Sequence, residues 1–274
     1  MSQSKPRVRS VACSAAAVSA AVLALTAAPA LATSAVYSNL PAPGIRATPS
    51  VGFDATQTSE FGGAVELAAG STRNPTVTIV LTSWACQQGS WYADDCVSEK
   101  HAKFSQPVSV SLYNVEADGA VGSEIATEEQ TLQVPYRPST NHTRCTGLTE
   151  EENVGGWWVG SEGRCADGLN AKFNYKFSLS KLPPRVIVAV SFSSTPPRTG
   201  EACESTAQGC PFDSLNVAVE EGGSGPSVGQ QIEPEDAYVK STWEPMYGTS
   251  GTPLGTFGIS NAEWKGYQPL FSIK

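Results

Sequence analysis

The stretch AKFNYKFSLS, residues 171–180, shows the fold class of this chain most clearly. Apolar and polar side chains alternate along it, so that every second residue from Ala171 to Leu179 is apolar. In a β-strand successive side chains point to opposite faces, and a period of two therefore places all the apolar groups on one face. The stretch predicts a strand with one face in a hydrophobic core and the other face in water.

The same alternation recurs in TVTIVLTSW (76–84), PVSVSLYNV (107–115) and SLNVAVE (214–220). The run RVIVAVSF (185–192) is apolar on both faces, as expected for a central strand that is covered from two sides. LQVPYRP (132–138) is a further predicted strand, and its internal proline favours a position at the edge of a sheet because proline cannot donate to the strand ladder.

Glycine- and proline-rich connections separate these runs, and helical periodicity is almost absent beyond the first part of the chain. Asp118-Gly119 predicts a tight reversal between two strands. Many short strands with such turns predict an all-β fold, an antiparallel β-sandwich of the jelly-roll or immunoglobulin-like kind. The acidic, glycine-rich stretch 220–236 is interpreted as a long loop, since residues 237–274 are too few for a core of their own. We therefore expect one sandwich domain over residues 33–274.

Residues 1–32 have the pattern of a secretory signal peptide. A short basic start precedes an apolar, alanine-rich stretch from Val11 to about Leu25, and Ala30-Leu31-Ala32 supplies the small-residue cleavage site. The pattern predicts export through the general secretory route with cleavage near Ala32. No transmembrane segment is expected after that cleavage.

The charge balance is acidic, with a formal net charge of -8 for the whole chain. Removing the predicted signal peptide takes away three positive charges and no negative ones, which gives -11. Such a protein repels phosphate backbones and anionic lipid headgroups. Nucleic-acid binding is therefore disfavoured, and the expected partner is an extracellular glycan or an envelope protein.

Seven cysteines are present, and Cys13 lies within the predicted signal peptide. Six cysteines remain after cleavage, and an even number of cysteines in an exported chain indicates disulfides. Six cysteines allow fifteen pairings, but their spacing forms three local pairs. The expected bridges are Cys86–Cys96, Cys145–Cys165 and Cys203–Cys210. A zinc site is the rival interpretation, and the chain lacks the clustered C-x-x-C spacing that it needs.

The motifs of common enzymes are missing from the sequence. The chain has only two histidines, His101 and His142, both in polar surroundings, and it has no G-x-S-x-G elbow and no phosphate-binding glycine loop. A glycoside hydrolase remains an alternative because it needs only two suitably spaced carboxyl groups. The carboxylates considered for that role are Asp54, Glu60, Asp94, Asp95 and Asp213. No cofactor is expected, and a structural calcium ion has only weak support because no D-x-D-x-D-G loop is present.

The aromatic residues inside the two larger predicted disulfide loops are the candidate ligand-binding residues. Trp91 and Tyr92 lie between Cys86 and Cys96, and Trp157 and Trp158 lie between Cys145 and Cys165. A ring on a rigid loop can stack on the apolar face of a sugar with little ordering entropy to lose. The neighbouring polar groups that would bond hydroxyls are those of Asp94, Asp95, Glu162 and Asn153.

The alternative for these rings is structural, since a tryptophan in a stapled loop can also cap the open end of a sandwich. In an extended chain, neighbouring side chains point to opposite faces. Trp157 and Trp158 are therefore not expected to be buried together, and at least one of the two should be exposed. Trp84, at the end of a predicted strand, is expected to pack at the core or the sheet edge.

The order of SVGFDATQTSEFGGAVEL, TVTIVLTSWAC, VSVSLYNV, VPYRPS, LPPRVIVAVSF and PFDSLNVAV resembles a family of exported bacterial, actinobacterial-type β-sandwich proteins, surface-bound or secreted and of unknown function. The resemblance covers about residues 36–219 and implies a fold and a compartment only. Together with the aromatic loops, it leads us to expect a secreted, non-catalytic extracellular binding module with carbohydrate as the leading ligand class. A structural or adhesive cell-envelope protein is the first alternative, and a glycoside hydrolase is the second.

Overall fold

The computed structural model describes residues 34–56, 58–68, 70–91, 93–145, 156–193, 214–220, 225–232, 236–241, 252–260 and 266–274. The predicted signal peptide, Tyr92, Asn153, Cys203, Cys210 and Asp213 lie outside these residues. Within them the chain is almost entirely β-structure, with a single short helix, α1 (Phe53–Thr56). The predicted antiparallel all-β fold is confirmed.

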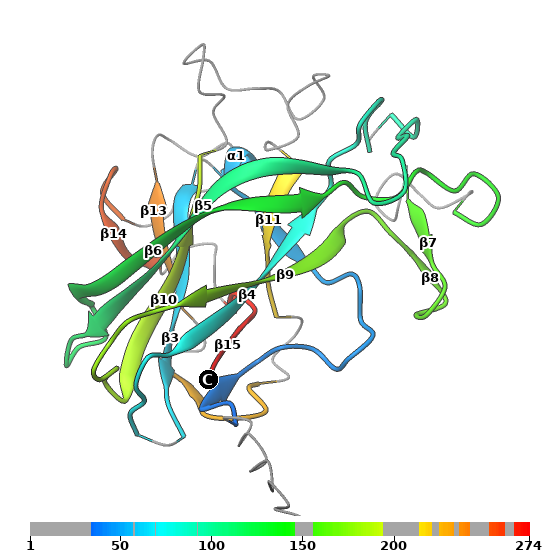
Figure 1. The fold of residues 1–274 in the computed structure, drawn as a ribbon. Helices are drawn as coiled ribbons and strands as arrows, with labels where there is room; N and C mark the ends of the chain where they lie inside the picture. The colour runs from blue at the N-terminus through cyan, green and yellow to red at the C-terminus, as the bar shows by residue number, and fades with distance from the viewer. Residues whose placement is uncertain are drawn as a thin grey trace, which may run out of the picture. The chain divides into compact units, whose positions relative to one another are not determined.

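One layer is a six-stranded antiparallel sheet (Figure 1). Its strands are β1 (Tyr37–Ser38), β15 (Phe271–Ile273), β4 (Thr76–Ser83), β11 (Leu215–Ala218), β2 (Ser50–Gly52) and β9 (Leu169–Lys176). β9 pairs with β4 along its whole length, whereas β15 and β11 pair with successive parts of β4. β4 is therefore the centre of this sheet.

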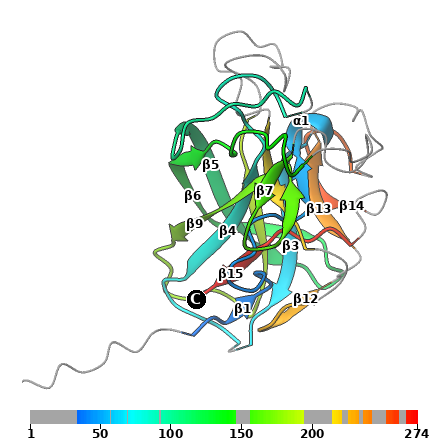
Figure 2. The same cartoon turned by 90° about the vertical axis from the view of Figure 1, so that its right-hand side faces the viewer.

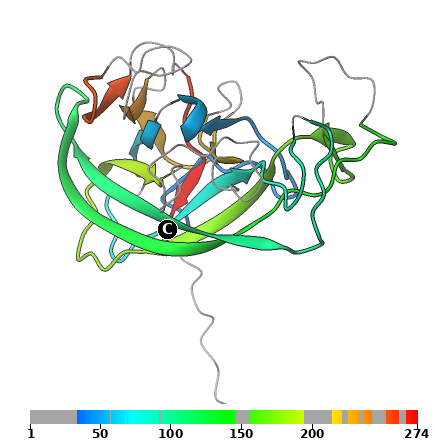
Figure 3. The ribbon, with the colours of Figure 1, turned by 90° about the horizontal axis from the view of Figure 1, so that it is seen from above.

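The other layer is a seven-stranded antiparallel sheet. Its strands are β14 (Phe257–Ser260), β13 (Ala237–Ser241), β3 (Thr58–Glu66), β10 (Arg185–Ser191), β5 (Lys103–Val115), β6 (Val121–Pro135) and β12 (Gln230–Ile232), the last of which also pairs with β3. β10 lies between β3 and β5, as its two apolar faces predict, and β6 is an edge strand. β5 and β6 form a long hairpin that curves along one side of the sandwich (Figure 3).

The main hydrophobic core lies between the two sheets and takes side chains from both. Alternate residues of β5, from Phe104 to Leu112, are buried, while β9 buries Tyr175 and exposes its neighbours. The Tyr175 hydroxyl donates to the carbonyl of Val108 at 3.0 Å, and so joins β9 to β5 across the core. The period of two in the sequence therefore gave the correct buried face on these strands.

A second apolar cluster covers part of the opposite face of the seven-stranded sheet, around Ile187 and Tyr238. Glu60 of β3 is buried, and it accepts a hydrogen bond of 2.7 Å from the hydroxyl of Tyr113. Burial raises the pKa of the Glu60 carboxyl, although the Tyr113 hydrogen bond and the charge of Lys240 act in the opposite direction.

The segment after the long loop contributes to both layers. β13 and β14 extend the seven-stranded sheet, whereas β15 enters the six-stranded sheet next to β4. The long loop itself carries the short strand β12. In the described part of the chain, the one helix is far too short to cross a membrane.

A separate hairpin of β7 (Trp157–Val159) and β8 (Arg164–Ala166) stands at one end of the sandwich. Figure 2 looks onto this end, with β7 toward the viewer. Among the residues that the structure describes, the two strands pair only with each other. Other contacts must therefore hold this hairpin in place.

Candidate functional site

Two disulfides lie in the loops at this end of the molecule. Cys86 is bonded to Cys96 and Cys145 to Cys165, with Cα–Cα distances of 5.4 and 5.7 Å. Two of the three predicted bridges are thereby confirmed, and the third lies outside the described residues. The bridges are compatible with an oxidising, extracellular location.

The segment 136–145 joins the two stapled loops. The backbone N–H of Thr140 donates to the carbonyl of Cys96 at 2.9 Å, and that of Asn141 donates to the carbonyl of Gly156 at 3.0 Å. The segment thus contacts the first loop on one side and the approach to β7 on the other. Both loops are therefore held on one backbone strap.

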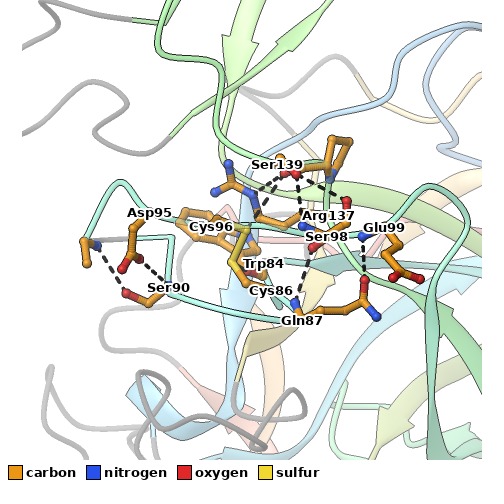
Figure 4. The surroundings of a disulfide bond; sticks show 12 residues. Trp84, Cys86, Gln87, Ser90, Asp95, Cys96, Ser98, Glu99, Arg137 and Ser139 are labelled. Atoms are coloured by element: carbon orange, nitrogen blue, oxygen red, sulfur yellow. Dashed lines mark hydrogen bonds between the residues drawn. A yellow bond between two sulfur atoms is a disulfide. The ribbon is translucent and has the colours of Figure 1, made fainter.

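A buried cation, Arg137, lies at the centre of this arrangement, beside the Cys86–Cys96 disulfide (Figure 4). Its Nε donates to the carbonyl of Pro138 at 3.2 Å. Burial lowers the pKa of the guanidinium to about 10, and the negative charges of Asp167 and Asp94 oppose that shift. Burial also raises the pKa of Asp167, against the charge of Arg137. The charge of Arg137 therefore interacts with Asp94 of the first stapled loop and with Asp167, which follows Cys165 in the chain.

The first loop is tight because its backbone must turn within a few residues. Gly89 has φ +68°, in the left-handed region that favours glycine, and a Cβ there would collide with the backbone of Asp95. The N–H of Ser90 donates to Asp95 Oδ1 at 2.8 Å (Figure 4). Asp94 contacts His142 of the joining segment, with 3.5 Å between Oδ2 and Nδ1. Both aspartates predicted to bond a ligand thus already have partners, one in the first loop and one in the joining segment.

Trp91 packs against Trp84 and is half-buried. The two rings meet edge to face with their centroids 4.7 Å apart. The indole N–H of Trp84 donates to the hydroxyl of Ser50 at 3.2 Å, and Trp84 packs at the sheet edge as expected. The first loop therefore closes over the end of β4 through a pair of tryptophans.

Trp157 and Trp158 point to opposite sides of β7, as strand geometry predicts. Trp157 is only 7% exposed and packs in a small apolar cluster with Ala47, Val159 and Ala166. Trp158 is half-buried, and the Arg144 guanidinium lies 5.1 Å from its ring centroid, in the range of a cation–π contact. The ring of Trp157 is therefore buried in the apolar cluster, and the ring of Trp158 is only partly buried, on the other side of the strand.

The Trp157 indole also fixes the position of β7 over the six-stranded sheet. Its Nε1 donates to the carbonyl of Gly168 at 3.2 Å. A Cβ at residue 168 would lie 2.7 Å from Trp84 Nε1 and would collide with Thr82. The absence of a side chain at Gly168 is therefore what lets the two tryptophans approach the same point of the backbone.

A cavity of about 540 Å³ opens between β7, the end of β6 and the segment 98–102. Trp157 and Tyr136 contribute aromatic wall, and Ser98, Ser139 and Ser161 contribute hydroxyl groups. Four further lining residues are charged or titratable and exposed: Arg46, Glu99, Lys100 and His101. The cavity therefore combines ring surface, hydrogen-bonding groups and a mostly cationic rim.

The structure brings only part of the predicted aromatic set to this cavity. Trp157 lines it, Trp158 and Trp91 do not, and Tyr92 lies outside the described residues. Glu162 is bonded to Arg164, with 2.9 Å between Oε2 and Nη2. Tyr136 is not among the predicted site residues, because it lies in the run 132–138, whose pattern indicates only an edge strand.

The carboxylates considered for glycoside hydrolysis are spread over the fold. Glu60 lies on β3, whereas Asp94 and Asp95 lie in the first stapled loop. The side chain of Asp54 and the whole of Asp213 are outside the described parts. Among the described residues, no group of three or more His, Cys, Asp or Glu side chains is arranged to hold a metal ion.

No protein-family model, no curated protein and no solved structure matches this chain. The resemblance to exported bacterial β-sandwich proteins stays a prediction.

Proposed function

We propose that the protein is a secreted, non-catalytic binding module that holds a glycan in the cavity next to Trp157 and Tyr136. The observation that carries this proposal is the cavity itself, about 540 Å³ in volume and lined in part by β7, within the loop closed by Cys145–Cys165, and by the segment that follows Cys96. Binding sites for small ligands usually measure about 300 to 1,000 Å³ and combine apolar walls with a few polar groups. A mono- or disaccharide matches the volume of this cavity in size.

The chemistry of the walls supports a sugar over a purely apolar ligand. Aromatic rings bind the C–H face of a pyranose, while the hydroxyls of Ser98, Ser139 and Ser161 exchange hydrogen bonds with sugar hydroxyls. The strap and the disulfides hold these groups in place before the ligand arrives, so that little ordering entropy is lost on binding.

The rim charges favour an acidic glycan. The rim carries two cations, Arg46 and Lys100, and one carboxylate, Glu99, in a chain whose formal net charge is -8. A local cationic rim on an acidic protein attracts an anionic group to that rim alone. A uronate or phosphate-bearing sugar is therefore preferred to its neutral counterpart.

Binding is tested with acidic and neutral polysaccharides and their oligosaccharides, followed by tryptophan fluorescence. An acidic oligosaccharide should shift the emission, and Tyr136→Ala should lower its affinity roughly tenfold through loss of the ring contact. Tyr267→Ala is the matched control, because Tyr267 is 41% exposed and does not line this cavity. Replacing Arg46 and Lys100 by Gln should weaken the acidic ligand and leave a neutral one unchanged.

The proposal is wrong if no glycan changes the emission, or if the Tyr136→Ala variant binds as the parent does. Release of reducing sugar from a bound glycan would instead support a glycoside hydrolase. Capture of an envelope protein without any glycan response would support the structural or adhesive alternative.

A further inference from the structure

A second cavity, of about 620 Å³, lies on the other side of the wall that bounds the first one. The shared wall is formed by residues 45–47 and the turn between β7 and β8, since Arg46 and Ser161 line the first cavity whereas Ala47 and Glu162 line the second. The hydroxyl of Ser161 donates to the carbonyl of Gly44 at 3.4 Å and helps to hold this wall together.

Much of the second cavity is apolar. Leu40, Ile45, Val219 and Leu270 line it, and they come from the N-terminal segment, the end of β11 and the approach to β15. Ile45 is 41% exposed, which is unusual for so large an apolar side chain in this fold. Such walls suit the hydrocarbon part of a ligand.

The lining also contains the Arg164–Glu162 ion pair and one further carboxylate, that of Glu220. Glu220 is 8% exposed. Its Oε2 accepts hydrogen bonds from Gln231 Nε2 at 2.6 Å and from Asn39 Nδ2 at 3.4 Å. Its Oε1 is buried and accepts no hydrogen bond from any described residue.

No cation of the protein neutralises Glu220 in the described part of the chain, where the ion pairs join other residues. The nearby Arg164 is engaged elsewhere, because it is bonded to Glu162 and donates from Nη2 to the carbonyl of Ala47 at 2.6 Å. The negative charge of Glu220 also acts on its surroundings: burial raises the pKa of the Tyr37 hydroxyl, and the Glu220 charge adds to that rise against a hydrogen bond with Gln231.

A buried carboxylate oxygen without a partner is costly, and a charged donor compensates for it better than a neutral one. Oε2 already has two neutral amide donors, and the charge is still uncompensated. The geometry points to a binding site for a protonated primary amine on an unbranched apolar stem. Its ammonium group pairs with the Glu220 carboxylate, and its stem packs on Leu40, Ile45 and Leu270. This site is separate from the proposed glycan cavity and goes beyond it.

The test uses pentylammonium as the probe and pentanol as its neutral counterpart, added to the ¹⁵N-labelled protein. Saturable shifts are expected at the backbone amides of Val219, Gly225 and Leu270, which line the second cavity, and not at Ser139 or Gly160 of the first. Pentanol should bind at least about tenfold more weakly, because a charge-assisted hydrogen bond is lost.

Two variants of the second cavity and one control variant keep the test independent of folding. Glu220→Gln preserves the shape and should lower pentylammonium affinity at least about tenfold. Ala42→Trp fills the cavity from its exposed rim, leaves Glu220 intact and should abolish binding. Glu99→Gln, which makes the same charge change at the first cavity, should leave the affinity unaltered.

The inference is overturned if pentylammonium gives no saturable shifts at these amides, or if pentanol binds equally well. It is also overturned if the folded Glu220→Gln variant retains the parent affinity. A negative result for glycans at the first cavity has no bearing on these outcomes, because glycan binding is followed by tryptophan fluorescence and pentylammonium binding by the amides that line the second cavity.

Discussion

Removing the Cys145–Cys165 bridge should release the β7–β8 hairpin without unfolding the sandwich. The perturbation is the double variant Cys145→Ala, Cys165→Ala. Within the described part of the chain, the two strands pair only with each other, and Trp157 packs in a small cluster that is distinct from the main core. The hairpin therefore has few contacts that would link its opening to global unfolding.

The magnitude follows from the length of the closed loop. The two cysteines are 20 residues apart in the sequence. The chain-entropy relation for a loop of about 20 residues gives about 3 kcal/mol of lost stabilisation. Converted at about 1.4 kcal/mol for each factor of ten, this corresponds to opening roughly 150-fold more often.

Native-state hydrogen exchange measures this opening residue by residue. The backbone amides of β7 and β8 that exchange through local opening should exchange about 150-fold faster in the variant. Those of Val186–Val190 in the central strand β10 should remain more protected than β7 and depend more steeply on denaturant, because they exchange through global unfolding. A matched variant without Cys86 and Cys96, which are 10 residues apart, should affect its own loop about 0.6 kcal/mol less strongly.

Two outcomes would refute this reasoning. If exchange in β7 accelerates less than about tenfold, the small cluster around Trp157 holds the hairpin without the bridge. If Val186–Val190 and β7 show the same protection and the same dependence on denaturant, the hairpin and the sandwich unfold as one unit.

Two further changes act on buried positions. Since burial raises the folded-state pKa of Glu60, the stability linked to it is present at acidic pH and is lost as pH rises through that value. Glu60→Gln should therefore raise the unfolding temperature near neutral pH and have little effect near about pH 3; equal effects at both would contradict the assignment. Gly168→Ala should destabilise the protein by about 1 to 3 kcal/mol in urea unfolding, because the new Cβ meets Trp84 and Thr82. An unchanged urea midpoint would show that these side chains move aside at no cost.

Much of the fold was predictable because the deciding signals are local. The alternation in residues 171–180 gave the buried face of β9, and the two apolar faces of 185–192 gave its central place in a sheet. The bridges Cys86–Cys96 and Cys145–Cys165 followed from short separations, since nearby cysteines meet most readily.

The candidate site was predicted only in part. The stapled loops and the division of Trp157 and Trp158 between two sides follow from spacing and strand geometry. Their rings nevertheless do not form one platform, because Trp157 is buried against Ala47 and Arg144 lies against the ring of Trp158. No pattern in the sequence predicts either contact.

By itself the sequence determined the strands, the local disulfides and the acidic balance, because each depends on neighbours along the chain or on composition alone. Only the tertiary structure decided that Arg46 and Tyr136 share a cavity with Trp157, and that Glu220 is buried behind Leu40 and Leu270. These groups are far apart in the sequence. Whether these residues contact one another depends on how the two sheets pack and on which backbone groups form hydrogen bonds with each other. No local sequence pattern indicates either.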